Sequence, residues 1–516
     1  MKSTFTFLAL LLIPMCAWAQ FNPQQEKLTA KFFPDAELDI HTPAFAKKEG
    51  FTNYDEMLAW LNTCIKPHSS VVTLSFIGSS QKGKQIPMLV FNRQNGKTKT
   101  KVWMQGGLHG DEPAGTETML YLTDKLLNDT AYAYLLTELE IAIVPMANID
   151  GYEKQTRESA NGTDLNRDQT KLSAPESKAL KAAYTNFTPA VALDFHEFRP
   201  FRKDFTGFGT RGISSFYDAM FLYSGNLNVP EALRSYTQTR FVNNAKAHLT
   251  ENNLNHHDYI TPRKAGGLVE FNLGSVHARS SASNWSLGNT VSTLLEIRGV
   301  GIGRTSFKRR IKTSFLIAES YLKSAYAERV KLRELLKETG SSFTESIVVT
   351  AESNKEKQVI KAIDLEKNEA VDLEITIRNA LHAKPILKRI RPTAYILSAD
   401  EKKASANLRI LGIQLDSLEK DTELETEAYT ITEFDAEENE DEEASGPKSS
   451  ASTVVQKQVF TKGTYIIYTA QPRGNLVSEV LEPENEDGFL AMKVIKGTAG
   501  KKLPVYRYMK PGKINK

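Results

Sequence analysis

The sequence predicts an α/β domain followed by a smaller β-rich domain. In the first part of the chain, apolar strand-like segments at residues 101–105, 141–145 and 190–196 alternate with helical patterns, and this alternation is typical of α/β folds. After residue 345 the residue pattern changes to short segments of alternating or clustered apolar residues, which indicate strands. The chain has 516 residues, more than the roughly 250–300 at which single cores stop growing.

A tetrapeptide between the first such strand and helix has the residue types of a metal site. Residues 101–105 are followed by two glycines, then by His109 and Glu112, and residues 116–127 have helical apolar spacing. Zinc binds imidazole nitrogen and carboxylate oxygen, and a catalytic zinc has three protein ligands and one open position. Because His-x-x-Glu pairs often arise by chance, a surface histidine beside a solvated acid is the alternative.

A third ligand is available at the end of another strand. The apolar segment 190–196 ends in His196, and Asp194 shares its face because side chains alternate along a strand. A helix is expected just before this strand, since Ser173 and Glu176 form a capping box with proline in the first turn. The alternative for His196 is a histidine of the core or rim that is satisfied by hydrogen bonds.

Glu296 is the candidate general base. It stands in the middle of the apolar segment 292–299, and glutamate is rarely buried unless it is paired or functional. A desolvated carboxylate has a raised pKa, which suits a general base near neutral pH. A structural ion pair with Arg298, on the same strand face, is the alternative and is compatible with catalysis.

The segment after strand 141–145 carries candidate anion ligands. Glycine and Asx residues between positions 148 and 168 indicate a long irregular loop, which contains Arg157, Asn166 and Arg167. A guanidinium group matches a carboxylate in a bidentate way, so this loop is a candidate carboxylate clamp. An ordinary solvated loop with local Asx turns is the alternative.

With these pieces in order, the chain resembles the M14 family of zinc carboxypeptidases. The resemblance begins near Tyr54, runs to about Arg304, and has a closing helix that ends near Leu336. It implies a mixed central sheet flanked by helices over residues 54–340. The motifs that carry it, in chain order, are His109-x-x-Glu112, Asn148-x-Asp150-Gly151, Asp164-Leu165-Asn166-Arg167, Asp194-Phe195-His196 and Leu295-Glu296-Ile297-Arg298.

The resemblance implies a role for eight residues and one zinc ion per chain. The implied zinc ligands, general base and oxyanion-stabilising residue are His109, Glu112, His196, Glu296 and Arg157. The residues implied to hold the substrate's terminal carboxylate, and to orient the first zinc histidine, are Asn166, Arg167 and Asp164. The implied substrates are the C-termini of peptides or proteins.

The chain departs from the family pattern in two places. Ile149 stands where the family often has proline, and residues 198–283, which should contain the specificity pocket, align with no pattern. Within that segment Tyr259 is a candidate lid tyrosine, and Arg279 with the Ser280-Ser281 pair are candidate pocket residues.

The net charge bears on which binding partners are expected, and the first 19 residues bear on where the protein is located. The formal net charge of +3 predicts neither a nucleic-acid surface nor a membrane-binding one. Residues 1–19 have the basic start, short apolar run and A-x-A site of a secretory signal, so cleavage near Ala19 and export to the periplasm or medium are expected. Only Cys64 would then remain, which excludes an intrachain disulfide. No later segment is long and apolar enough to span a bilayer.

The remaining segments are an entry segment at residues 20–53 and the β-rich domain at residues 345–516, read as a small sandwich. Residues 433–443 are strongly acidic, which is typical of a disordered surface loop. The basic triplet at 308–310, in the closing helix, reads as a solvated face.

The function expected from these patterns is hydrolysis of C-terminal peptide bonds by a zinc-activated water. Two alternatives stay open. One is a zinc amidohydrolase acting on acyl-amino acids or cell-wall peptides. The other is a non-catalytic binding protein on the same scaffold, in which the β-rich domain carries the function.

Overall fold

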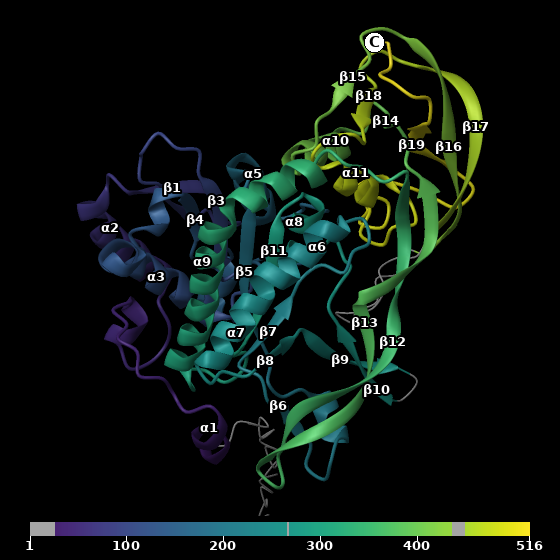
Figure 1. Cartoon of the computed structure of the whole chain (residues 1–516). Coiled ribbons are helices and arrows are strands. Elements are labelled where there is room, and N and C mark those ends of the chain that lie inside the picture. Colours follow the sequence, from purple (N-terminus) through teal and green to yellow (C-terminus); the bar gives the residue numbers. More distant parts are fainter. Residues whose placement is uncertain (1–25, 266–267, 436–448, 516) are drawn as a thin grey trace, which may run out of the picture.

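The computed structural model describes residues 26–265, 268–435 and 449–515 (Figure 1). The expected signal peptide and most of the acidic stretch 433–443 lie outside these residues, so both stay predictions. Within the described ranges, no helix has the length and apolar character needed to cross a membrane.

A mixed eight-stranded sheet forms the centre of the first part of the chain. Its middle strands β4, β3, β5 and β11 run parallel to one another. On one side β2 pairs with β4 in antiparallel fashion, and on the other side β7 pairs with β11 in the same way. Every residue of β5 is buried, as expected for a strand covered on both faces. In spatial order the strands are β1 (Val72–Ser79), β2 (Gln85–Phe91), β4 (Leu139–Val144), β3 (Thr100–Gly106), β5 (Val191–Phe198), β11 (Val291–Arg298), β7 (Ala219–Leu222) and β8 (His256–Asp258).

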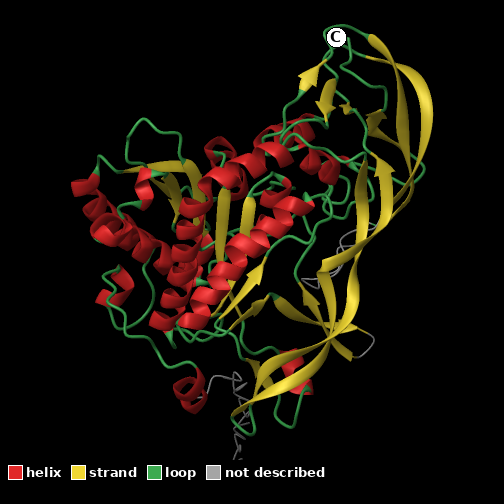
Figure 2. Ribbon diagram, in the orientation of Figure 1, coloured by secondary structure: helices red, strands yellow, loops and turns green. Residues whose placement is uncertain are grey.

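Helices flank this sheet, as Figure 2 shows, and confirm the predicted α/β class. The long α9 packs on α3, on α7 and on the central strands, α5 packs on β1, and α8 packs on β11. The helices before the β-rich region are α1 (Glu26–Phe32), α2 (Tyr54–Ile65), α3 (Pro113–Asn128), α4 (Ile149–Lys154), α5 (Pro175–Phe187), α6 (Glu231–Tyr236), α7 (Asn243–Glu251), α8 (Ser281–Leu287) and α9 (Phe307–Thr339).

Two local expectations are wrong. Helix α5 has no capping box: its N-cap is Ala174, which makes no side-chain cap, and Ser173 Oγ instead donates to Asp168 at 2.8 Å. The basic triplet in α9 is not a solvated face either. Arg310 is only 3% exposed and donates to Glu197 at 2.8 Å, because the helix presents this side to the sheet.

The β-rich region begins with a long hairpin that joins the first part of the chain. Strands β12 (Ser346–Asp364) and β13 (Glu369–Ile390) pair with each other and also with β6 (Ile213–Ser215) and β10 (Leu268–Leu273). With β9 (Ile260–Ala265) they form a five-stranded sheet in the order β6-β12-β13-β10-β9. The hairpin therefore completes a sheet that starts within the unaligned segment 198–283.

A second, six-stranded sheet follows and confirms the β-rich character of the C-terminal region. The main hydrophobic core is continuous, since it contains both Trp103 of β3 and Tyr395 of β14. The division of the chain near residues 340–345 stays a prediction. The strands of this sheet, in spatial order, are β15 (Asp416–Ser417), β18 (Tyr465–Tyr468), β14 (Ala394–Leu397), β19 (Lys502–Tyr508), β16 (Thr422–Phe434) and β17 (Ser449–Phe460), and the accompanying helices are α10 (Lys402–Ile410) and α11 (Gly474–Leu481).

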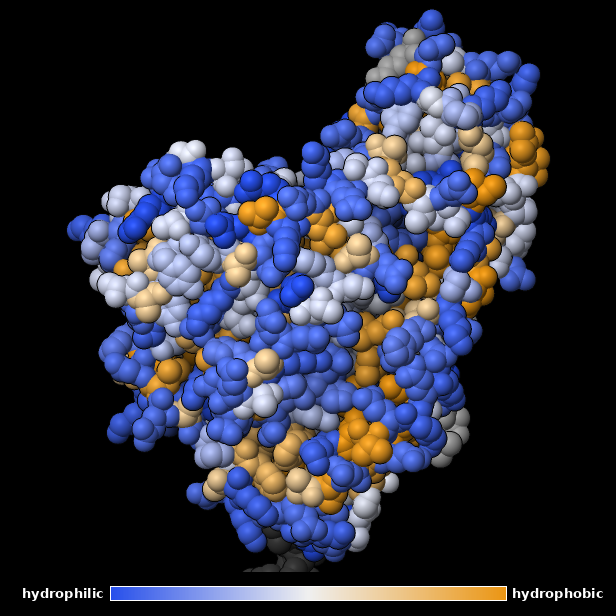
Figure 3. Space-filling view, in the orientation of Figure 1, coloured by the Kyte–Doolittle hydropathy of each residue, from blue (hydrophilic) through white to orange (hydrophobic). Residues whose placement is uncertain are grey.

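The outer surface differs between the two sides of the molecule. In Figure 3 the face over α7 and α9 is mostly hydrophilic, whereas apolar atoms gather in patches toward the β12–β13 hairpin. The more exposed apolar side chains include Val359, Ile386 and Ile390 of that hairpin.

Candidate metal centre and substrate cavity

The junction between β3 and α3 holds the first two candidate ligands. Gly107 has a φ of +65°, a backbone conformation that favours glycine and turns the chain sharply after the strand. His109 lies in the loop between this turn and the N-terminus of α3, and Glu112 is the N-cap residue of that helix. Both side chains are buried, so the reading of this pair as a solvated surface motif is wrong.

The third ligand and the candidate base come from two neighbouring parallel strands. His196 of β5 and Glu296 of β11 are direct partners in the register of that pair. Since β3, β5 and β11 run the same way, their carboxyl ends meet at one edge of the sheet, where open α/β sheets place their sites. The fold thereby brings together residues up to 187 positions apart in the chain.

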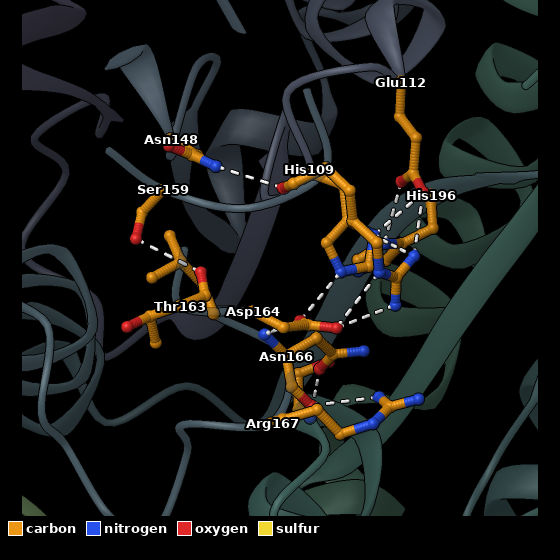
Figure 4. A network of polar contacts seen from close by, with 12 residues as sticks. His109, Glu112, Asn148, Ser159, Thr163, Asp164, Asn166, Arg167 and His196 are labelled. Carbon is orange, nitrogen blue, oxygen red and sulfur yellow. Dashed lines mark hydrogen bonds and ion pairs between the residues drawn. The ribbon is translucent and has the colours of Figure 1, made fainter. Parts of the chain in front are cut away.

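The three candidate ligands converge on one point (Figure 4). Nδ1 of His109 lies 2.8 Å from Glu112 Oε1 and 3.0 Å from Nδ1 of His196. The same nitrogen of His196 lies 2.9 Å from Glu112 Oε2. Among the described residues, no other group of three such side chains is close enough to share an ion.

The chemistry of this donor set fits a zinc ion. Two imidazole nitrogens face each other, and Glu112 Oε2 is buried without a hydrogen bond of good geometry among the described residues. Lone pairs aimed at a common centre are costly to bury unless a cation joins them. Ligand distances of about 2.0–2.2 Å place tetrahedral zinc ligands about 3.4 Å apart, which small movements of these side chains would reach.

Further carboxylates orient the two histidines from behind. Asp164 Oδ1 lies 3.1 Å from His109 Nε2, and Asp194 Oδ2 lies 3.0 Å from His196 Nε2. A carboxylate hydrogen-bonded to the far ring nitrogen, as Asp164 is to His109, fixes the tautomer and turns Nδ1 toward the ion site. Asp194 lies at ion-pair distance from His196 on the corresponding side of that ring. Burial opposes ionisation of Asp164, but His109 and Arg157 outweigh it and hold its pKa well below the usual value.

Arg157 lies beside the candidate metal centre. Its Nε and Nη2 donate to Asp164 Oδ2 at 3.1 and 2.9 Å, and its Nη1 lies 3.2 Å from His109 Nδ1. The carboxylate thus holds the guanidinium against the site, where a developing negative charge would be stabilised.

Glu296 is the carboxylate whose environment best fits a proton carrier. Burial first, and then the negative charge of Glu112, raise its pKa to about 7, although His196, His109 and Arg157 lower it. The neighbouring Arg298 donates to the backbone oxygen of Ser215 at 2.6 Å and lies over the Phe33 ring at 3.8 Å.

Asn166 and Arg167, the candidate carboxylate clamp, line the same cavity as the candidate metal centre. A cavity of about 1170 Å³ is lined by His109, Glu112, Arg157, Asn166, Arg167 and Glu296. Asn166 Oδ1 accepts the backbone N–H of Ser281 at 2.9 Å. Because that oxygen is engaged, the NH₂ group is the part of the Asn166 amide that remains to donate to a ligand. The candidate lid residue Tyr259 and the candidate pocket residues Arg279 and Ser280 line the cavity as well, whereas Ser281 is not among its lining residues.

Sequence reasoning missed the buried acids that fix α3 in place. Glu197 accepts the backbone N–H of Ala114 at 3.0 Å while it pairs with Arg310. Glu117 accepts Thr42 Oγ1 at 2.6 Å and the backbone N–H of Thr52 at 3.1 Å, which ties the entry segment to this helix. An acid directly after His196, in an otherwise mostly apolar segment, is the signal that could have indicated Glu197.

The α/β fold and this His–Glu–His cluster fit a metal-dependent hydrolase, and comparison with known proteins shows which family the chain resembles. Residues 57–193 match the family model described as zinc carboxypeptidase, Peptidase_M14. Carboxypeptidase 2 of Trichophyton rubrum is 27% identical over 452 residues, which are 83% of this chain and 81% of that protein. Over these residues the chain is similar to the zinc carboxypeptidases of the M14 family, and this similarity supports a hydrolase that acts on peptide bonds.

Two further proteins are similar to parts of this chain. A protein of Trichophyton verrucosum named an inactive metallocarboxypeptidase is 27% identical over 184 residues, 33% of this chain and 28% of that protein. Among solved structures, carboxypeptidase A from Helicoverpa armigera has 20% identity and a TM-score of 0.43, and the match covers 55% of this chain and 78% of that one.

Proposed function

We propose that the chain is a metallocarboxypeptidase that removes the C-terminal residue of peptides. One zinc ion per chain would be held by His109, Glu112 and His196. The observation that carries the proposal is that one cavity contains this cluster, the half-buried Glu296 and the Asn166–Arg167 pair. A carboxylate clamp within reach of a hydrolytic centre is what release of a terminal residue requires.

In this proposal Glu296 moves the proton. Zinc, when bound, supplies Lewis acidity that polarises a carbonyl group and makes water a better nucleophile near neutral pH. Glu296 accepts the proton of the attacking water and later delivers it to the leaving amine. A pKa of about 7 suits both transfers, because the group gains and loses a proton readily near that pH.

Arg157, Asn166 and Arg167 supply the positive and polar contacts. Arg157 is placed to stabilise the oxyanion that forms as the carbonyl is attacked. Arg167 and the NH₂ group of Asn166 would bind the terminal carboxylate of the substrate. That contact fixes which peptide bond reaches Glu296, so the enzyme would act on chain ends and not on internal bonds.

The test compares one peptide with a free C-terminus against the same peptide as its C-terminal amide. We expect the amide to lose several kcal/mol of transition-state binding, about the cost of leaving a buried charge unpaired. Arg167→Ala should remove most of this discrimination by slowing only the free acid. Arg157→Ala should lower kcat for either substrate.

The measurement is kcat/KM for both peptides with the wild type and the two variants. Equal cleavage of acid and amide, or cleavage of internal bonds, would contradict the clamp and favour the amidohydrolase alternative. Binding of intact peptide without any turnover by the zinc-loaded wild type would favour a non-catalytic binding protein.

A further inference from the structure

The C-terminal β-rich region contributes to the wall of the catalytic cavity. Val348 and Glu352 of β12, together with Asn485, Glu486 and Asp487 of the loop after α11, line the same cavity as His109 and Glu296. These residues lie far beyond residues 57–193, which the family model matches. The cavity is therefore built from both parts of the chain, which share one core.

One group of polar contacts between the two parts lies at the segment just before α8. Asp487 is 3% exposed. Its Oδ1 lies 3.6 Å from Nε of Arg279, and its Oδ2 lies 3.4 Å from Nδ1 of His277. Glu486 Oε1 lies 3.3 Å from the same His277 nitrogen.

The same segment also contacts the clamp loop on its other side. Ser281 N–H donates to Asn166 Oδ1 at 2.9 Å, and the backbone oxygen of Arg279 accepts the N–H of Gln169 at 3.4 Å. Asn166, Arg167 and Arg279 line one cavity. The backbone of the Arg279 segment is thus held against the clamp loop, and the Arg279 side chain lines the same cavity, with Asp487 at ion-pair distance from it.

We propose that Asp487, supplied by the C-terminal region, sets the charge preference for the residue that is released, by compensating Arg279 beside the carboxylate clamp. This rests on the function proposed above. With the pair intact, the charge of Arg279 is compensated, and this wall accepts a neutral terminal side chain. An acidic terminal side chain would lose its hydration and meet no uncompensated cation, which makes its burial costly.

Loss of the Asp487 charge should reverse this preference. In Asp487→Asn the guanidinium of Arg279 keeps its charge and has no ionised partner at this position. Charges interact strongly at short range in a partly buried site. The terminal carboxylate and an acidic side chain of the same residue would then each find a cation, one on Arg167 and one on Arg279.

The experiment uses two peptides that differ only in a terminal Gln or Glu, two side chains of nearly equal shape. For the wild type we expect a higher kcat/KM with Gln. In Asp487→Asn the Glu/Gln ratio of kcat/KM should rise about tenfold or more, mainly through KM, since the change is one of charge attraction. Asp487→Glu should restore the wild-type ratio.

A matched control separates charge selection from general damage. Glu319 of α9 is a buried acid shared between His248 at 2.8 Å and Lys323 at 2.9 Å, and it does not line the cavity. Glu319→Gln should leave the Glu/Gln ratio unchanged. If Asp487→Asn lowers both substrates equally and keeps the ratio, the role of Asp487 is structural and the inference is wrong. If the wild type releases neither residue, the proposed function itself fails.

Discussion

Glu296 and His196 face each other across one register position of two parallel strands, so in the proposed mechanism a single pair of residues would couple metal binding to proton transfer. Both strands are buried apart from the half-buried Glu296. Their side chains are therefore held with little freedom, as a general base beside an attacking water must be.

We predict that Glu296→Gln folds and binds zinc but loses most turnover. The amide keeps the shape of the carboxylate and cannot accept a proton, and general acid–base catalysis contributes about a hundred- to ten-thousandfold. Zinc content and kcat, measured on the same preparation, test this. A kcat close to that of the wild type would assign the proton transfer to another residue.

We also predict that His196→Ala loses zinc and activity together. Removal of one of three converging ligands leaves Glu112 and His109 to hold the ion alone. The check is metal content per chain after dialysis, with His256→Ala as control, because His256 on β8 lies outside the cluster. Full zinc occupancy in His196→Ala would rule out the ligand set.

For single residues, the sequence predicted the side chains that line the candidate site better than the side chains that hold those residues in place. His109, Glu112, His196 and Glu296 lie in short motifs at the ends of apolar strands, where local pattern is informative. Glu197 and Arg310 form their pair across 113 positions, and no local pattern records such a contact. Arg310 therefore read as a surface residue.

At the scale of elements, the metal-site loop and α4 approach each other closely. A Cβ built on Gly110 would lie 2.0 Å from the backbone carbon of Gly151. The absence of a side chain at residue 110 lets the two backbones touch, and the contact brings the Arg157 segment next to His109, since Gly110 N–H donates to the backbone oxygen of Arg157 at 3.4 Å.

We predict that Gly110→Ala lowers both stability and zinc affinity. Forced separation of two packed backbones costs about 1–3 kcal/mol or more, and it shifts His109 away from its partners. Thermal unfolding and a zinc titration with a competing chelator measure the two effects. Gly207→Ala is the matched control, because a Cβ there meets nothing within 4 Å, and it should change neither quantity appreciably.

Element positions followed from apolar periodicity where strands and helices are buried and short. The predicted segments 101–105 and 116–127 became β3 and α3 with ends shifted by a few residues. The β12–β13 hairpin was predicted only as fragments, because its strands of 19 and 22 residues are largely solvent-facing and interleave polar residues. Helix α4 formed within an expected loop, where Asn148 caps it by accepting Gly151 N–H at 3.0 Å.

For the molecule as a whole, a buried carboxylate at the junction of its two parts should make stability depend on pH. Glu479 of α11 accepts Asn228 Nδ2 at 2.6 Å and Asn485 Nδ2 at 2.7 Å. Burial raises its pKa to about 7, although these amides and Asn226 lower it. The folded chain thus holds this proton at pH values where the unfolded chain, with an ordinary value near 4.5, has released it.

We predict that this group's contribution to stability is greatest below pH 4.5 and declines as pH rises from there to about 7. In that window the folded state binds more protons than the unfolded state, so the free energy of unfolding falls with pH. Glu479→Gln, which resembles the protonated carboxyl, should be more stable than the wild type at pH 8, by an amount on the order of 1–3 kcal/mol. Denaturant unfolding of both proteins at pH 5 and pH 8 tests this, and an equal pH dependence would contradict it.

The pairing of the β12–β13 hairpin with β6 and β10 also has a consequence for synthesis. A ribosome completes residues 213–273 well before it reaches residues 346–390. Until then the edges of β6 and β10 that pair with β12 and β13 in the finished protein have no partner strand. Unpaired edges of this kind recruit other strands and favour aggregation. The nascent chain would thus remain without a finished cavity until the hairpin and the 485–487 loop have emerged, and hydrolytic activity would appear only when nearly the whole polypeptide has been made.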